Sequence, residues 1–223
     1  MKAFDVIYED NHLLVVNKTA GILVQGDATA DKTLGDYAKD YIAKKYHKPG
    51  AVFLGIVHRL DRPVSGLVVL ARTSKALERM NEQFRERSTE KTYWAIVKQK
   101  PKKESDTLIH WLKKDPEKNK TTAFSKEMPQ TQRAELSYQI IKPVSDHWLL
   151  EVKPITGRPH QIRVQLASMG CPIRGDLKYG YQEATQNASI CLHARSLSFL
   201  HPVKKEQLSL EAAVPSEKYW DLI

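Results

Sequence analysis

The chain has 223 residues, 41% of them apolar, which is enough for one substantial core or two smaller ones. Its formal net charge of +9 favours a polyanionic partner without proving one. No run of 18 apolar residues and no signal-peptide pattern is present, and two cysteines cannot form a disulfide framework; these features argue against membrane-spanning and disulfide-rich secreted proteins and favour a cytoplasmic location.

The beginning of the chain predicts a hairpin followed by a helix. Residues 4–8 and 13–17 read as two antiparallel strands, with Asp10 and Asn11 at the turn. Thr33 is a suitable N-cap for a helix whose apolar side chains follow helical spacing. These side chains are Leu34, Tyr37, Ala38, Tyr41 and Ile42.

Residues 58–71, HRLDRPVSGLVVLA, combine a cation and a carboxylate with a buried strand. The apolar run 66–71 is typical of such a strand. If the backbone is extended before it, Arg59 and Asp61 project to the same side, because side chains alternate along extended chain. We therefore expect an acid and a cation at the edge of a sheet, where loops often carry function.

A second helix and a strand follow. Ser74 is a suitable N-cap for a helix that runs to about Arg87. Its inward-facing residues are expected to be Leu77, Met80 and Phe84. Residues 93–97 alternate as a strand does.

Residues 99–132 are polar, lysine-rich and weakly periodic. We predict a mobile excursion here with one short strand near 108–112. Between Lys98 and Lys120 there are eight lysines against four acids. Such a run is either a solvated face or a surface that contacts phosphates without reading base sequence.

The remainder predicts more strands and one helix. Residues 134–141 and 148–152 form an antiparallel pair, and 190–199 and 208–212 form two further strands. Pro159 occupies the first turn of a helix that ends at Gly170, with Ile162, Leu166 and Met169 as its buried stripe. Strands that mostly adjoin strands indicate an α+β fold, a mostly antiparallel mixed sheet flanked by helices and loops. We expect a single catalytic domain over residues 1–223.

Five segments, in order, resemble motifs of the RluA-type family of pseudouridine synthases. Residues 58–71 resemble the active-site signature HRLDxxTSGxxxxA, and KTYWAIV at 91–97 resembles the KxYxAxV strand. The other three are VNKTAG at 16–21, TGRPHQIR at 156–163 with GCPIRGD and YG after it, and LHA at 192–194 with His201-Pro202. The resemblance implies a synthase fold. Because the active-site signature begins at His58, we expect no small N-terminal RNA-binding domain of the S4 type before it.

The resemblance also implies the chemistry. Uridine isomerisation breaks the C1′–N1 bond, turns the uracil and rejoins it through C5, so we expect no redox cofactor. The histidines and cysteines form no two ligand pairs at zinc spacing, so we expect no metal either. Asp61 corresponds to the catalytic nucleophile or base. Arg163 corresponds to the arginine that pairs with that aspartate, since a guanidinium stays charged and grips a carboxylate in two places. Tyr93 corresponds to the tyrosine that packs on the uracil and helps to remove the C5 proton, although an aromatic residue on a strand is also typical of a core.

Four further residues are expected to bind substrate. Arg59 resembles a wedge that fills the gap left by a flipped-out base. Arg158 is a candidate for phosphate or loop contact, and Leu192 resembles the apolar floor of the uracil pocket. His58 belongs to the same segment, but a structural hydrogen-bonding role suits it better than acid–base work.

The sequence departs from the family pattern at three positions. Val64 replaces a threonine, Gln165 a histidine and Thr19 a proline. None of these removes a group with a direct chemical role, so we expect them to bear on substrate preference.

The expected substrate is a structured RNA, a ribosomal or transfer RNA stem-loop, bound by a monomer without protein partners. Two alternatives remain open. A non-catalytic RNA-binding or chaperone protein would share charge and fold without needing an intact Asp61, Tyr93 and Arg163. A nucleoside glycosidase would need a second carboxylate and a placed water.

Overall fold

The computed structural model describes residues 2–26 and 30–223. The chain forms two compact units: Met1–Glu90 with Ala194–Val214, and Lys91–His193 with Pro215–Ile223. Each unit draws on two separate parts of the sequence. The expectation of one catalytic domain over the whole chain stays a prediction.

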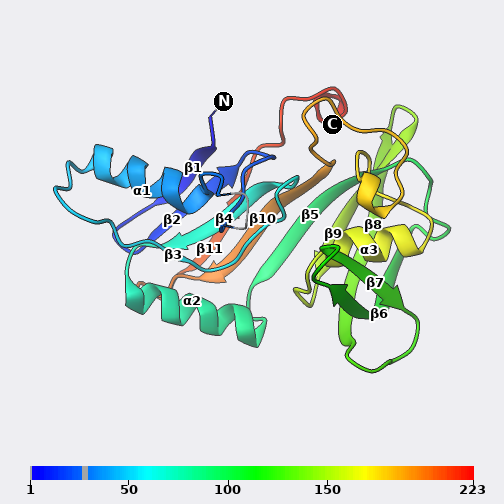
Figure 1. Ribbon diagram of the computed structural model, residues 1–223, viewed down its shortest axis with the longest axis horizontal. Helices are drawn as coiled ribbons and strands as arrows, with labels where there is room; N and C mark the ends of the chain where they lie inside the picture. Colours follow the sequence, from blue (N-terminus) through cyan, green and yellow to red (C-terminus); the bar gives the residue numbers. More distant parts are fainter. Residues whose placement is uncertain (1, 27–29) are drawn as a thin grey trace. The chain divides into compact units, whose positions relative to one another are not determined.

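The first unit is built on strands in the order β1-β2-β4-β10, with β3 added to β4 and β11 added to β10 (Figure 1). The pairings β1–β2, β2–β4, β3–β4 and β10–β11 are antiparallel. The hairpin expected at the start of the chain is thereby confirmed. The elements are β1 (Phe4–Glu9), β2 (Leu13–Lys18), α1 (Leu34–Lys45), β3 (Gly55–Ile56), β4 (Ser65–Ala71), α2 (Ser74–Glu86), β10 (Leu192–Leu200) and β11 (Gln207–Glu211).

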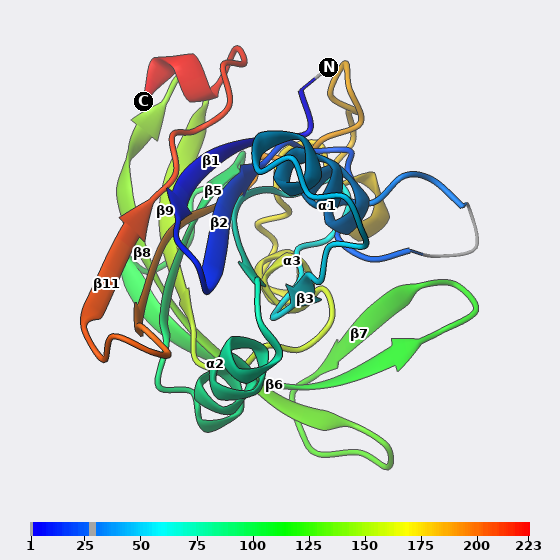
Figure 2. The ribbon, with the colours of Figure 1, turned by 90° about the vertical axis from the view of Figure 1, so that its left-hand side faces the viewer.

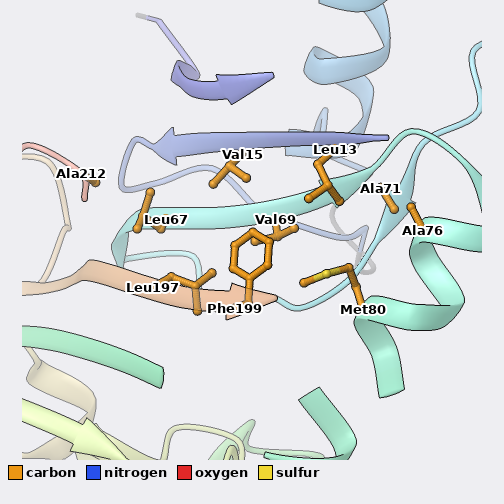
Figure 3. Packing of buried hydrophobic residues seen from close by; sticks show 10 residues of the cluster. All are labelled: Leu13, Val15, Leu67, Val69, Ala71, Ala76, Met80, Leu197, Phe199 and Ala212. Atoms are coloured by element: carbon orange, nitrogen blue, oxygen red, sulfur yellow. The ribbon is translucent and has the colours of Figure 1, made fainter. Parts of the chain in front are cut away.

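The core of this unit lies between its strands and α2 (Figure 3). All seven residues of β4 are buried, as the uninterrupted apolar run predicts. Met80 of α2 is fully buried, while Leu77 and Phe84 pack partly buried against the same cluster. Removing this apolar surface from water is the main force that holds α2 to the sheet. The cluster comprises Leu13, Val15, Leu67, Val69, Ala71, Ala76, Met80, Leu197, Phe199 and Ala212.

The two helix starts are set by threonines. Thr33 caps α1 as predicted, within a capping box in which Thr33 Oγ1 accepts from the Asp36 N–H and the Asp36 carboxylate accepts from the Thr33 N–H. The cap of α2 is Thr73, so the prediction of Ser74 was wrong by one residue. Thr73 has extended backbone angles and its Oγ1 accepts from the Ala76 N–H at 3.2 Å, whereas Ser74 is already helical.

The second unit contains strands in the order β5-β9-β8-β6-β7, and every pairing in it is antiparallel. The mostly antiparallel α+β fold is confirmed. Among the described residues, no helix is long and apolar enough to cross a membrane. The elements are β5 (Glu90–Val97), β6 (Ser105–Asp115), β7 (Lys120–Phe124), β8 (Gln132–Val144), β9 (His147–Pro154), α3 (Gln161–Ser168) and the short 3-10 helices η1 (Leu177–Tyr179) and η2 (Trp220–Leu222).

Half of the lysine-rich stretch 99–132 is strand, so the prediction of one short strand near 108–112 was wrong, while the mobility of the segment stays a prediction. β6 pairs with β8 on one side and β7 on the other, and Figure 2 shows β6 and β7 side by side as a hairpin. Leu112 is buried on β6 and Thr121 on β7, while many of their neighbours are exposed. The apolar alternation that marks a half-buried strand is therefore weak in this sequence.

Helix α3 is shorter than predicted. It begins at Gln161 because His160 has φ of 55°, a left-handed conformation that a right-handed helix cannot contain, so Pro159 lies outside the first turn. Ile162 and Leu166 are buried as expected, but Met169 lies beyond the last helical residue and is half-buried. The helix is buried nearly all round, which places Arg163 inside the second unit.

Candidate active site

Asp61 lies on a turn that leads into β4. The Val64 N–H donates to the Asp61 carbonyl at 3.0 Å and closes this turn across Arg62 and Pro63. Asp61 is half-buried and Arg59 is exposed. The turn thus offers a carboxylate that is partly shielded from water beside a cation that a nucleic acid can reach.

The side chain of His58 is held by two contacts within the protein. Its Nε2 accepts from the Val69 N–H at 3.1 Å, so the ring proton is on Nδ1, and the ring stacks on Phe84 with centroids 4.7 Å apart. The imidazole thereby satisfies a backbone donor of β4 just beyond the end of β3. These contacts favour the structural role, and a contact with substrate stays a prediction.

Lys18 is a functional candidate that the sequence reasoning missed. Its side chain is fully buried at the end of β2, and Nζ lies 3.0 Å from the Thr19 carbonyl, 2.9 Å from that of Ile22 and 3.4 Å from that of Arg62. Burial lowers the pKa of Lys18 to about 7, and the negative charge of Asp61 opposes this shift. A lysine that ends the apolar strand LLVVNK was the signal in the sequence.

Gly66, the glycine of the SG pair in the motif, is required for steric reasons. Gly66 has φ of +114°, and a Cβ atom built on it would clash with the main chain of Ala194. Only glycine permits this backbone conformation together with so close an approach of β4 to the neighbouring strand. The residue shapes the strand that holds the Asp61 turn.

In the second unit, Arg163 is held by a carboxylate that the sequence reasoning did not identify. Its Nε donates to Asp176 Oδ2 at 2.7 Å and its Nη2 to Asp176 Oδ1 at 2.9 Å, with both side chains buried. The guanidinium also lies over the ring of Tyr179, with 5.0 Å from Cζ to the ring centroid. Asp176 belongs to the GD pair after α3, and this pair was the feature of the sequence that could have identified it. The expected pairing of Arg163 with Asp61 would join residues of the two units and stays a prediction.

The other expected site residues of this unit are placed by strands and loops. Tyr93 is half-buried on β5 opposite Val152 of β9, and Leu192 is buried at the start of β10. Arg158 precedes α3, and its Nε donates to the Arg133 carbonyl at 3.2 Å. The roles expected for these three residues in binding uracil or phosphate stay predictions.

The three departures from the family pattern occupy structural positions. Val64 is buried, and Thr19 donates from Oγ1 to the Lys2 carbonyl at 2.9 Å. Gln165 is fully buried on α3; its Nε2 donates to the Leu108 carbonyl at 3.1 Å and lies 3.1 Å from His110 Nδ1. This glutamine thus ties α3 to β6.

The chain has two cysteines, and neither is part of a disulfide. Cys171 and Cys191 are both buried, and burial raises the pKa of Cys191 to about 12. In the described part of the chain, no three residues of the types His, Cys, Asp and Glu are grouped to hold a metal ion.

Comparison with known proteins agrees with the motifs. Residues 12–168 match the family described as RNA pseudouridylate synthase. The chain belongs to this family. It is 32% identical over 222 residues to ribosomal large subunit pseudouridine synthase C of Vibrio cholerae, covering 93% of this chain and 64% of the relative. It is 33% identical over 223 residues to ribosomal large subunit pseudouridine synthase D of Zymomonas mobilis, covering 96% of this chain and 70% of the relative.

Solved structures of family members share the fold. The human RNA pseudouridylate synthase domain containing 4 matches with a TM-score of 0.78 and 26% identity, over 95% of this chain and 88% of that one. The human domain containing 1 matches with a TM-score of 0.75 and 23% identity, over 95% and 84%. The family expected from the motifs is confirmed, while the chain spans only 64% of the length of the Vibrio relative.

Proposed function

We propose that the chain converts uridine to pseudouridine within a structured RNA. The observation that carries this proposal is the family membership together with a half-buried Asp61 on the turn before β4. The names of the two bacterial relatives refer to the large ribosomal subunit, which favours ribosomal over transfer RNA as the substrate. We further propose that the protein acts as a monomer in the cytoplasm.

Asp61 is the catalytic carboxylate in this proposal. It serves as nucleophile or base while the C1′–N1 bond of the uridine breaks; the uracil turns, C5 bonds to C1′, and the C5 proton leaves. Tyr93 packs on the uracil and assists the removal of that proton. Leu192 supplies the apolar floor beneath the base.

Two arginines assist from different positions. Arg59, exposed beside Asp61, enters the RNA stack where the target base has left it, which offsets part of the few kcal/mol that flipping requires. Arg163 supplies a guanidinium that pairs with the Asp61 carboxylate and orients it. Arg158 contacts an RNA phosphate near the start of α3.

Tritium release from RNA carrying 5-tritiated uridine tests the proposal. The wild-type protein should release tritium, and Asp61→Asn should abolish release while RNA affinity stays within about twofold. Asp5→Asn, the same substitution at an exposed aspartate of β1, is the control and should keep full activity. Turnover by Asp61→Asn would refute the assignment of the catalyst. Binding of RNA without tritium release by the wild-type protein would favour the non-catalytic alternative.

A further inference from the structure

Tyr179 contacts Arg163 and two other parts of the second unit at once. It is buried in η1, with 9% of its surface exposed. Its hydroxyl accepts from the Thr121 N–H of β7 at 2.8 Å and lies 2.8 Å from His160 Nδ1. Burial raises the pKa of Tyr179, so its hydroxyl keeps a proton that it can donate to His160. The ring is thereby fixed from two sides.

The ring restricts a movement that the ion pair with Asp176 permits. A bidentate carboxylate holds Nε and Nη2 of Arg163 in one edge-to-edge arrangement. The guanidinium plane can still tilt about that edge. A fixed aromatic face 5.0 Å from Cζ blocks the tilt on one side and favours the cation lying over it.

The position of Tyr179 is in turn tied to the hairpin and to the start of α3. Thr121 of β7 not only donates to the Tyr179 hydroxyl but also donates from Oγ1 to the Pro159 carbonyl at 3.0 Å. Thr121 is buried, so both hydrogen bonds lie away from water. The loop before α3, the 3-10 helix η1 and β7 therefore meet at the Tyr179 hydroxyl.

We propose that Tyr179 is a positioning residue, which holds the guanidinium of Arg163 in the orientation that catalysis requires. This inference rests on the proposed function, in which Arg163 serves the catalytic aspartate. In this role Tyr179 acts on the reaction only through Arg163. Its effect should therefore appear in kcat and depend on the presence of Arg163.

The test compares Tyr179→Leu with a control that the chain itself supplies. Tyr181 is equally buried, with 7% exposed, and its ring lies 5.7 Å from the guanidinium of a different arginine, Arg174. Tyr181→Leu therefore removes the same side chain and the same kind of contact away from Arg163. Single-turnover and steady-state tritium release, RNA affinity and thermal unfolding are measured for the wild-type protein and both variants.

We expect Tyr179→Leu to lower kcat by about 10- to 100-fold, because small misplacements of catalytic groups have effects of this size. Its KM for RNA should stay within about twofold, and Tyr181→Leu should keep kcat within about threefold at a similar loss of thermal stability. In an Arg163→Ala background, Tyr179→Leu should lower kcat no further. Equal kcat losses at both tyrosines, or full additivity with Arg163→Ala, would overturn the inference.

The phenylalanine variants decide the question if Tyr179→Leu does not fold. Tyr179→Phe keeps the ring but loses both hydrogen bonds of the hydroxyl, so a kcat several-fold lower than that of Tyr181→Phe supports the inference. Wild-type kcat in Tyr179→Phe overturns it. Failure of the proposed function is recognised separately, since the wild-type protein would then release no tritium and the inference would fall with it.

Discussion

The buried ammonium of Lys18 should make the stability of this protein rise with pH above neutrality. The pKa of Lys18 falls from its ordinary 10.5 to about 7 in the folded protein. Between these values the unfolded chain binds nearly one proton more than the folded chain does. Stability therefore rises as pH rises through this window, whereas below pH 7 the penalty of burying the charge is fully present. This lowering of the pKa corresponds to roughly 5 kcal/mol in total.

Lys18→Met removes the titrating group while keeping a long apolar side chain in the same space. The variant also leaves the three carbonyl acceptors of Lys18 without their donor, which changes the free energy of unfolding at every pH. Only the change in this free energy with pH therefore reports the effect of the buried charge. The linkage relation gives a gain of about 2 kcal/mol for the wild-type protein relative to Lys18→Met between pH 7 and pH 9.

Urea unfolding at half-unit steps across this range measures the difference. Lys39→Met, at an exposed lysine of α1, is the control and should follow the wild-type curve. Parallel curves for Lys18→Met and the wild-type protein would refute the reasoning. They would mean that the three carbonyls and Asp61 stabilise the buried ammonium as much as water stabilises it in the unfolded chain.

Four further substitutions, at three sites, test the architecture by urea unfolding. Gly66→Ala should cost about 3 kcal/mol or more, or prevent folding, because it places a Cβ against the main chain of the adjacent strand at a positive φ; a loss below about 1 kcal/mol would contradict the close approach. Asp176→Asn should cost about 3–5 kcal/mol, since it leaves the buried guanidinium of Arg163 without its carboxylate, and a change within about 1 kcal/mol would show that the pair contributes little. Thr73→Ala should cost about 1 kcal/mol while Ser74→Ala should be nearly neutral; the reverse order would return the cap of α2 to Ser74.

Elements that local residues determine were predictable from the sequence. The run 66–71 has no polar interruption, so burial on both faces of β4 followed directly. The capping box at Thr33 and the apolar spacing after it determined α1. The start of α3 was not predictable in this way, because only a small minority of non-glycine residues, histidines included, adopt the left-handed angle that His160 has.

The lysine-rich hairpin of β6 and β7 shows a second limit to what the sequence predicts. β6 and β7 expose many side chains, so their strand character comes from pairing with β8 and with each other, not from an apolar face. Composition predicts mobility for such a segment, whereas backbone hydrogen bonds to partners distant in sequence give it order. Pairing of this kind appears only once the rest of the sheet is known.

Partners of charged residues were the least predictable part of the site. Asp61 and Arg163 were both expected as catalytic ions, and the structure gives each an opposite charge within its own unit: the Lys18 ammonium interacts with Asp61, and the Asp176 carboxylate binds Arg163. A buried or half-buried ion with a counter-charge nearby does not depend on a single partner to remain ionised. Replacing Arg163 should therefore lower kcat to a residual but measurable level without leaving Asp61 devoid of a neighbouring cation. The pairing proposed for catalysis would then contribute orientation and electrostatic tuning more than it contributes to the stability of either unit.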